Sequence, residues 1–191
     1  MMQTKWVFVL GISLLFLACN KASMEIREYE VLAPSSSSSS SETLPAFIRA
    51  QVKWLTPAGW REKPASGMRL ASFVLETDLE AQHSPEISLV SLAGDAGGLV
   101  ANVNRWREQL SLAPMSGLEI QQTVKKDHSQ LGAFEWVHFS ANQEPSANAM
   151  IAALFFDEKT STTLFLKMQG SKKQLEYYQN DFLSLCRSLR K

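Results

Sequence analysis

The sequence predicts a single α+β domain, an antiparallel sheet with helices packed on it, behind an N-terminal export segment and a polar tether. Three observations lead to this fold class. Strand-like segments come in runs, one helical segment interrupts them, and a second helical segment ends the chain. Consecutive strands of this kind pair antiparallel, and an amphipathic helix must bury its apolar stripe against the resulting sheet.

Residues 1–18 have the layout of a secretory export signal. Lys5 supplies a positive charge, and residues 6–17 form an almost entirely apolar run. A run of this length fits a secretory hydrophobic region and is too short to cross a hydrocarbon core of ~30 Å as a helix. Ordinary signal cleavage, an uncleaved anchor and a buried helix of the fold are the alternative interpretations of this segment.

The residues directly after the apolar run, Phe16-Leu17-Ala18-Cys19, resemble the lipobox of bacterial lipoproteins, in which a small residue precedes an invariant cysteine. The resemblance implies that the Cys19 thiol receives a diacylglycerol and that Cys19 becomes the first residue of the mature protein. Two or more acyl chains give durable membrane anchoring. Asn20 is not the aspartate that commonly retains lipoproteins in the inner membrane, so the resemblance implies an outer-membrane location facing the periplasm.

Residues 19–45 are expected to comprise the lipidated cysteine and a disordered tether. The segment is polar and contains seven consecutive serines at 35–41. Such a run buries too little apolar area to offset its ordering entropy. Residues 46–191 then form one globular domain. Cys186, the second cysteine, lies in an apolar helical stripe, which indicates a core residue rather than a nucleophile.

Apolar alternation and turn signals locate the strands of this domain. A short strand at 51–54 is followed by a turn at 56–60, whose Pro57 and Gly59 suit the turn geometry. Further strands are expected at 68–76, 86–92, 123–126, 134–139, 150–156 and 162–168. The last two form a hairpin across 157–161. The first strand of this hairpin is apolar on both faces, as expected for a central strand covered on both sides.

Two helices are expected. The first begins after the chain break at 94–98, has Asp95 near its N-cap and ends before Pro114. Its apolar stripe consists of Leu99, Val103, Trp106 and Leu110. The last helix begins at Ser171 and Gln174, which fit a capping box. Its stripe consists of Leu175, Tyr178, Phe182, Leu185 and Leu189.

Two stretches of the domain carry a family resemblance. The segment VKWLTPAGW at 52–60, followed by MRLASF at 68–73, resembles the start of Mog1/PsbP-like domains. The segment GDAGGLVANVNRWREQL at 94–110 is similar to a segment of uncharacterised bacterial exported proteins with that architecture. The resemblance covers about residues 52–190. It implies an α/β/α sandwich and a non-enzymatic binding or assembly-factor role, and it transfers no catalytic residue.

The candidate binding residues are Trp60, Asn102, Arg105 and Trp106. Asparagine is a mediocre helix former, so Asn102 and Asn104 within one helix call for a reason. On the helix, Asn102 and Arg105 share a flank with Gly98 and Gln109, beside the apolar stripe. This flank is either a polar binding strip along an aromatic wall that includes Trp60, or a buried hydrogen-bond network that ties the helix to a loop.

Composition and motif spacing disfavour several function classes. Nineteen basic and nineteen acidic residues balance, so no field of one sign favours nucleic acid as a partner. The three histidines have no metal-ligand spacing, and no GxSxG nucleophile elbow occurs. We therefore expect no cofactor, no metal and no catalytic residue. The expected partners are the membrane, through the lipid, and an envelope protein; the oligomeric state is left open. The alternative is an envelope enzyme or small-ligand-binding protein with a pocket near Trp60, Asn102, Arg105 and Trp106.

Overall fold

The computed structural model describes residues 52–64, 66–76 and 84–191, all of which belong to one compact unit. The predicted export segment at 1–18, the lipidation site Cys19, the tether at 19–45 and the first residues of the predicted domain lie outside the described residues. No helix in the described ranges is long and apolar enough to cross a membrane.

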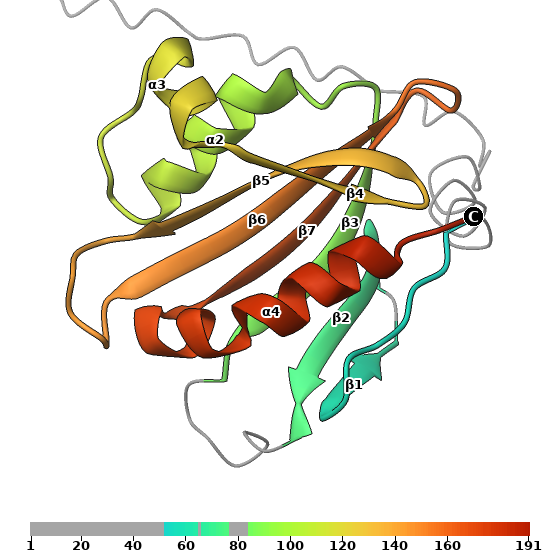
Figure 1. Ribbon diagram of the computed structural model, residues 1–191, viewed down its shortest axis with the longest axis horizontal. Helices are drawn as coiled ribbons and strands as arrows, with labels where there is room; N and C mark the ends of the chain where they lie inside the picture. The colour runs from blue at the N-terminus through green and yellow to red at the C-terminus, as the bar shows by residue number, and fades with distance from the viewer. Residues whose placement is uncertain (1–51, 65, 77–83) are drawn as a thin grey trace, which may run out of the picture. The chain divides into compact units, whose positions relative to one another are not determined.

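Within the described part of the chain, seven strands form one sheet in the order β1-β2-β3-β7-β6-β5-β4 (Figure 1). Their bounds are Trp60–Lys63 for β1, Arg69–Leu75 for β2, Glu86–Ala93 for β3, Lys125–Ser129 for β4, Gly132–Ser140 for β5, Asn148–Asp157 for β6 and Thr162–Ser171 for β7. Every neighbouring pair is antiparallel. The predicted antiparallel α+β class is confirmed.

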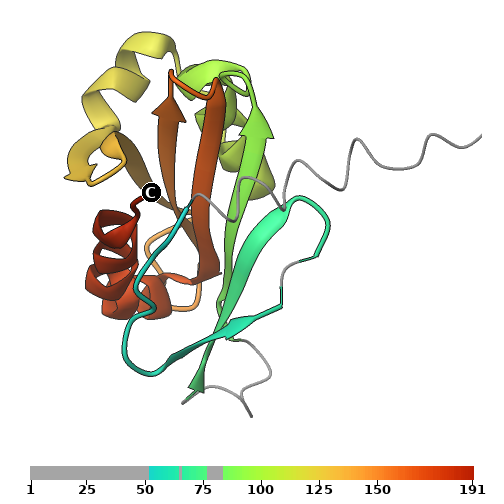
Figure 2. The same cartoon turned by 90° about the vertical axis from the view of Figure 1, so that its right-hand side faces the viewer.

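Three described helices pack on this sheet: α2 (Gly98–Gln109), α3 (Gly117–Thr123) and α4 (Lys172–Ser188). Two separate hydrophobic cores show which face each helix covers. One core joins Phe182 and Leu185 of α4 to the sheet, and the other joins Trp106 of α2 and Ile120 of α3 to it. In Figure 2, α4 lies on one side of the strands and α2 on the other. The fold is therefore a helix–sheet–helix sandwich.

Strand β6 lies between the two cores. Its residues Ala149, Ile151, Ala153 and Phe155 belong to the core under α4, and Met150, Ala152 and Leu154 belong to the core under α2. Side chains of a strand point alternately to the two faces of a sheet, so both sets must be apolar where both faces are covered. The prediction of a central strand covered on both sides is confirmed.

Both predicted helices form, and the structure shows that the N-cap of the first one is Gly97 rather than Asp95. The capping box of α4 is present: Ser171 Oγ accepts from the backbone N–H of Gln174 at 3.3 Å, and Gln174 Oε1 accepts from the backbone N–H of Ser171 at 3.0 Å. The N-cap of α2 is Gly97, at φ 86°, a left-handed conformation that glycine adopts without strain. Asp95 instead accepts a hydrogen bond from the Gly97 N–H at 3.1 Å and closes the preceding turn.

Three short elements differ from the sequence prediction. The expected strand at 51–54 is reduced, in its described residues, to one antiparallel bridge between Lys53 and Arg190. Strand β1 was not predicted because its sequence, WREK, shows no apolar alternation. Helix α3 was not predicted either. It has seven residues and buries only Ile120, so its N-terminal capping box of Ser116 and Glu119 is its main sequence signal.

Candidate functional site

The polar flank of α2 is built around Asn102, whose side chain is 1% exposed. Its Nδ2 donates to the backbone oxygens of Ala96 at 3.0 Å and Gly98 at 2.6 Å, and its Oδ1 accepts a hydrogen bond from Arg105. A buried amide needs such partners, because an unsatisfied polar group is costly away from water. Asn102 thus joins the loop before α2 to its first turns, as in the network interpretation of this flank.

Asn104 holds the other side of α2 in the same way. Its Nδ2 donates to the backbone oxygen of Met115 at 2.9 Å, and its Oδ1 accepts from the Met115 N–H at 2.8 Å. This pair of bonds holds the segment after the helix against the helix surface. A groove of about 590 Å³ remains between them, with Arg105, Glu108 and Pro114 among its lining residues. Arg105 as a ligand-binding residue stays a prediction.

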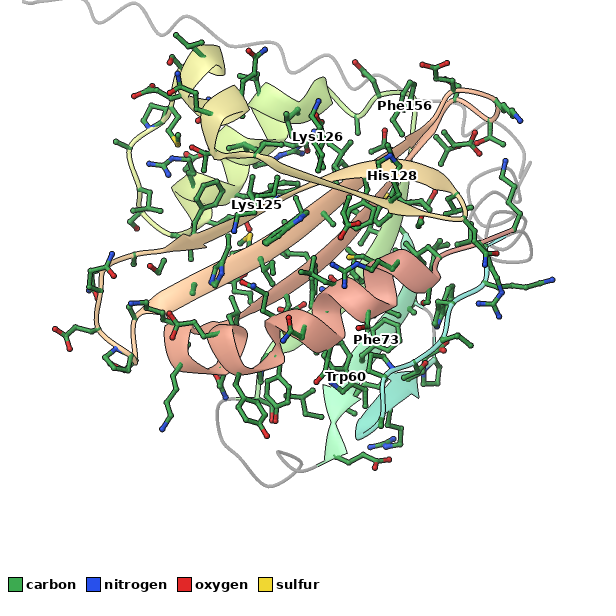
Figure 3. The ribbon with its side chains drawn as sticks, viewed as in Figure 1. Trp60, Phe73, Lys125, Lys126, His128 and Phe156 are labelled. Atoms are coloured by element: carbon green, nitrogen blue, oxygen red, sulfur yellow. The ribbon has the colours of Figure 1, made fainter. Side chains whose placement is uncertain are left out.

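The two candidate tryptophans lie on opposite faces of the sheet. Trp106 packs edge-on against Phe165 in the core under α2, with ring centroids 5.7 Å apart. Trp60 packs against Phe73 and Tyr178 in the core under α4, at 6.2 and 6.4 Å (Figure 3). The expected aromatic wall that includes Trp60 beside the α2 flank is therefore wrong. The α-helical spacing relates residues on one helix but does not show which face of the sheet a distant strand residue occupies.

The α2 side of the sheet is only partly covered by helices. The buried strand residues of that core all come from β5, β6 and β7, and Leu92 at the end of β3 is only partly buried against them. Strands β1 and β2 contribute no residue to this core and lie at the far end of the sheet from β5 (Figure 1). We call the uncovered part the open half-face. It consists of Arg61, Lys63, Arg69, Ser72, Val74, Glu86, Val90 and, at its border with α2, Lys167; Ser88 points to the same face but is buried, at 3% exposed.

One row of side chains runs across the open half-face. The strand register pairs Lys63 with Ser72, Ser72 with Ser88, and Ser88 with Lys167. Neighbouring strands lie about 4.8 Å apart, so two small hydroxyl residues separate two lysines in a continuous line. Lys63 and Ser72 also line a groove of about 410 Å³ on this part of the sheet.

A bulge in β2 adds Arg69 to the same face. The register shifts between Arg69 and Ala71, and both Leu70 and Ala71 are buried in the core under α4. The shift leaves Arg69 opposite Val90, on the α2 side. There its guanidinium forms an ion pair with Glu86 at 2.5 Å and lines the same groove.

Charge is concentrated on the open half-face although the whole chain is neutral. Four of its residues are basic, namely Arg61, Lys63, Arg69 and Lys167, whereas Glu86 is its one acidic residue. The half-buried Lys167 donates from Nζ to Gln109 Oε1 at 3.3 Å. Burial lowers the pKa of Lys167 below its ordinary value; the negative charge of Glu86 raises this pKa and the positive charge of Arg69 lowers it.

Sequence reasoning missed Lys167 as a site residue. The signal was present in the predicted strand at 162–168, where Lys167 follows Thr163 and Phe165 on one face of an otherwise apolar segment. In the structure Thr163 and Phe165 are buried and Lys167 is half-buried at the edge of α2.

Two further observations concern metal-ligating and thiol side chains. Within the described ranges, no cluster of three or more histidine, cysteine, aspartate or glutamate residues could hold a metal ion. Cys186 is fully buried in the core under α4, as expected, and burial raises the pKa of its thiol well above the ordinary value. A thiol in this state is a packing group rather than a nucleophile.

Comparisons with known proteins add the following. No family model matches the sequence, and no curated protein matches it either. Solved structures with a similar chain path include LpqN, involved in cell envelope biogenesis of Mycobacterium tuberculosis, at 14% identity and a TM-score of 0.49, covering 73% of this chain and 83% of that one. Cyanobacterial PsbP (CyanoP) from Synechocystis sp. PCC 6803 matches at 9% identity and a TM-score of 0.44, covering 74% and 92%.

A protein from Bacteroides thetaiotaomicron VPI-5482 matches at 8% identity and a TM-score of 0.43. That match covers 74% of this chain and 45% of the other. At these identities and TM-scores, none of the three matches carries an argument about function.

Proposed function

We propose that this chain is a lipid-anchored protein of the bacterial cell envelope whose folded domain binds a ligand on the open half-face without catalysing a reaction. The observation that carries the proposal is Lys167. Its ammonium group is half-buried at the border of a partly uncovered sheet, and among the described residues it has no carboxylate within ion-pair distance.

By itself, a partly desolvated cation of this kind lowers the stability of the folded state. Removing an ammonium group from water costs free energy unless an opposite charge compensates it. Within the described residues, the one hydrogen bond of Lys167 goes to the neutral amide of Gln109. An apolar residue there would extend the core that Phe165 enters two residues earlier. Ionisable groups with an energetic cost to the fold and a shifted pKa are concentrated at functional sites.

The hydrogen bonding of the α2 flank favours binding over catalysis. Asn102 uses both its amide nitrogen and its amide oxygen on neighbouring groups, and Asn104 does the same with Met115. Both side chains thus hold α2 in place, and Gln109 at the end of this helix contacts Lys167 at the border of the open half-face. A rigid wall beside a fixed cation is the arrangement expected of a preformed binding surface.

The binding surface can be tested by photo-crosslinking in cells. A benzoylphenylalanine replaces Val74, whose side chain lines the groove on the open half-face. The matched control replaces Tyr177 of α4, an exposed aromatic residue that belongs to the opposite side of the sheet. We expect a discrete adduct with an envelope component from position 74 only. No adduct at 74, or the same adducts from both positions, would refute the assignment of the binding surface.

The anchor is tested separately, through Cys19. The lipobox-like residues imply that its thiol carries the lipid, so Cys19→Ser should release the protein from washed membranes. Cys186→Ser is the matched control, because that thiol lies in the core. Separation of inner and outer membranes on a density gradient then tests the outer-membrane location. Unchanged membrane retention of Cys19→Ser would overturn the anchoring part of the proposal.

A further inference from the structure

We infer that a second groove, at the end of the sheet where β3 and β6 begin and β7 ends, binds a neutral carbohydrate through Glu86, Asn148 and Gln169. This groove has a volume of about 780 Å³, and all three side chains line it. It adjoins the open half-face at Glu86. The inference goes beyond the proposed function, because it assigns a separate site with its own ligand chemistry.

The strand register brings the three side chains together on one face. Glu86 pairs with Gln169, and Gln169 pairs with Met150 of the core under α2. Asn148 lies two residues before Met150 and therefore on the same face of β6. Directly opposed Cβ atoms lie about 5 Å apart and diagonal ones about 7 to 8 Å. Side chains at these separations can all contact one disaccharide.

The side of the groove formed by α4 is held in place by the loop between β5 and β6. The backbone N–H of Lys172 donates to Ala147 O at 2.8 Å. The backbone N–H of Lys173 donates to Pro145 O at 2.9 Å. The Lys172 Nζ also donates to Gln143 Oε1 at 3.0 Å. A ligand thus meets a groove whose wall is already ordered, which lowers the entropic cost of binding.

The same bonds disfavour an anionic ligand. A helix N-terminus attracts anions through its free N–H groups. The N–H groups of Lys172 and Lys173 are used by the loop, and that of Gln174 donates to Ser171 Oγ at 3.3 Å. The charged residues among the described lining residues are Glu86 and Lys173, one of each sign. The groove therefore offers no excess charge, and a neutral ligand suits it.

The hydrogen-bonding groups of the groove match hydroxyl groups. The side-chain amides of Asn148 and Gln169 form no hydrogen bond with another described residue. Each amide has two donors and one acceptor oxygen, whereas a hydroxyl both donates and accepts. Neighbouring hydroxyls of a sugar can therefore satisfy both parts of one amide. Glu86 binds Arg69 through Oε1, which leaves Oε2 to accept a charge-assisted bond from a further hydroxyl.

The sheet disfavours an extended peptide as the occupant. Such a peptide gains affinity by adding to an unpaired strand edge. Strands β3, β7 and β6 are each paired with a neighbour on both sides. Side chains must therefore supply the hydrogen bonds in this groove. Its described lining residues include no aromatic ring for stacking on a sugar, so we expect a Kd of about 1 mM.

Saturation-transfer difference NMR tests the binding, because it detects the ligand even when the protein is in a micelle. The full chain, in a polyoxyethylene detergent that carries no sugar, is titrated with maltose, cellobiose and N,N′-diacetylchitobiose. The final concentration is about twenty times the expected Kd. A saturable signal from any of the three supports the inference. The absence of a saturable signal from all three overturns it.

Variants then test the residues. Gln169→Met keeps the length of the side chain and removes its amide, and Asn148→Leu does so at an exposed position. Each should weaken binding at least tenfold. Gln121→Met is the matched control, because Gln121 is exposed in α3 and does not line the groove. Equal affinity in all three variants would contradict the site. Thermal denaturation shows whether each variant is folded.

Ionic strength tests the neutral charge of the ligand. Salt screens attraction between charges, so the affinity should stay constant between about 0.05 and 0.5 M salt. A loss of binding at high salt would overturn the assignment of a neutral ligand. The crosslinking experiment is independent of this site, because Val74 does not line the groove. Absence of sugar binding would therefore leave the open half-face as a binding surface, and absence of an adduct at position 74 would leave the carbohydrate site.

Discussion

Replacing Asn102 by alanine tests whether the α2 flank is held by the buried amide. The substitution removes the two hydrogen bonds that the 1%-exposed side chain donates, to Ala96 O and Gly98 O, and the one that it accepts from Arg105. Each donated bond contributes about 1 kcal/mol net, the exposed Arg105 regains water in place of its bond, and the small cavity left behind costs roughly 1 kcal/mol more. Alanine has a better helix propensity than asparagine, and this offsets about 0.6 kcal/mol of the loss. The expected loss of unfolding free energy is therefore about 2 kcal/mol.

Urea denaturation followed by tryptophan fluorescence measures this loss, because Trp106 lies in the core on which α2 packs. Glu108→Ala is the matched control on the same helix. Its side chain is exposed, so the substitution should cost about 0.5 kcal/mol or less. If Asn102→Ala is no less stable than Glu108→Ala, the buried amide does not hold the helix and the reasoning for this flank is wrong.

Three further predictions concern stability. Ser171→Ala removes the N-cap of α4 and should lower the unfolding free energy by about 1 kcal/mol in a denaturant titration. Gly170→Ala should lower the melting temperature, because an added Cβ would lie 3.2 Å from Leu175 Cδ1 in a packed region; an unchanged value would show that Leu175 moves aside freely. The pKa of Asp127 lies below its ordinary value of 3.8, chiefly because its carboxylate accepts a hydrogen bond from Arg187. With the folded-state pKa depressed, the stabilising contribution is complete above about pH 4 and is lost as the pH falls through the folded-state pKa. The melting temperature of Asp127→Asn should thus approach that of the parent chain in acid, and a constant difference would contradict this linkage.

Elements with a strong local period were predictable from the sequence. Helix α4 has an apolar residue every three or four positions and a capping box in front of it, and both features depend only on residues within a few positions of one another. The same holds for the β6–β7 hairpin, whose two apolar strands flank a polar turn. A local pattern of this kind predicts the folded structure correctly when tertiary packing favours the same element.

The elements that the sequence did not predict lack such a period. Strand β1 has four residues, of which Trp60 alone is fully buried, and its pairing with β2 supplies the evidence that it is a strand. Helix α3 has a single buried residue, Ile120. Both are stabilised by neighbours that are distant in sequence or by a cap, so a window of adjacent residues carries little signal for them.

The candidate site shows the same division between local and long-range information. The shared flank of Asn102 and Arg105 followed from helical spacing, and the hydrogen bond between these two side chains agrees with it. The separation of Trp60 from Trp106 did not follow, because it depends on which strand faces which helix. Lys167 became a candidate only when β7 was found beside β3, which brings Ser88 next to it.

The amino-acid sequence by itself determined the fold class, both long helices, the central hairpin and the division of the hairpin residues between two faces. Each of these follows from periodicity within one segment. Only the tertiary structure decided that β3 pairs with β7, and hence that two lysines and two serines from four strands share one row. Strand order depends on contacts between segments up to about eighty residues apart, as between β3 and β7, and no local period of the chain encodes those contacts.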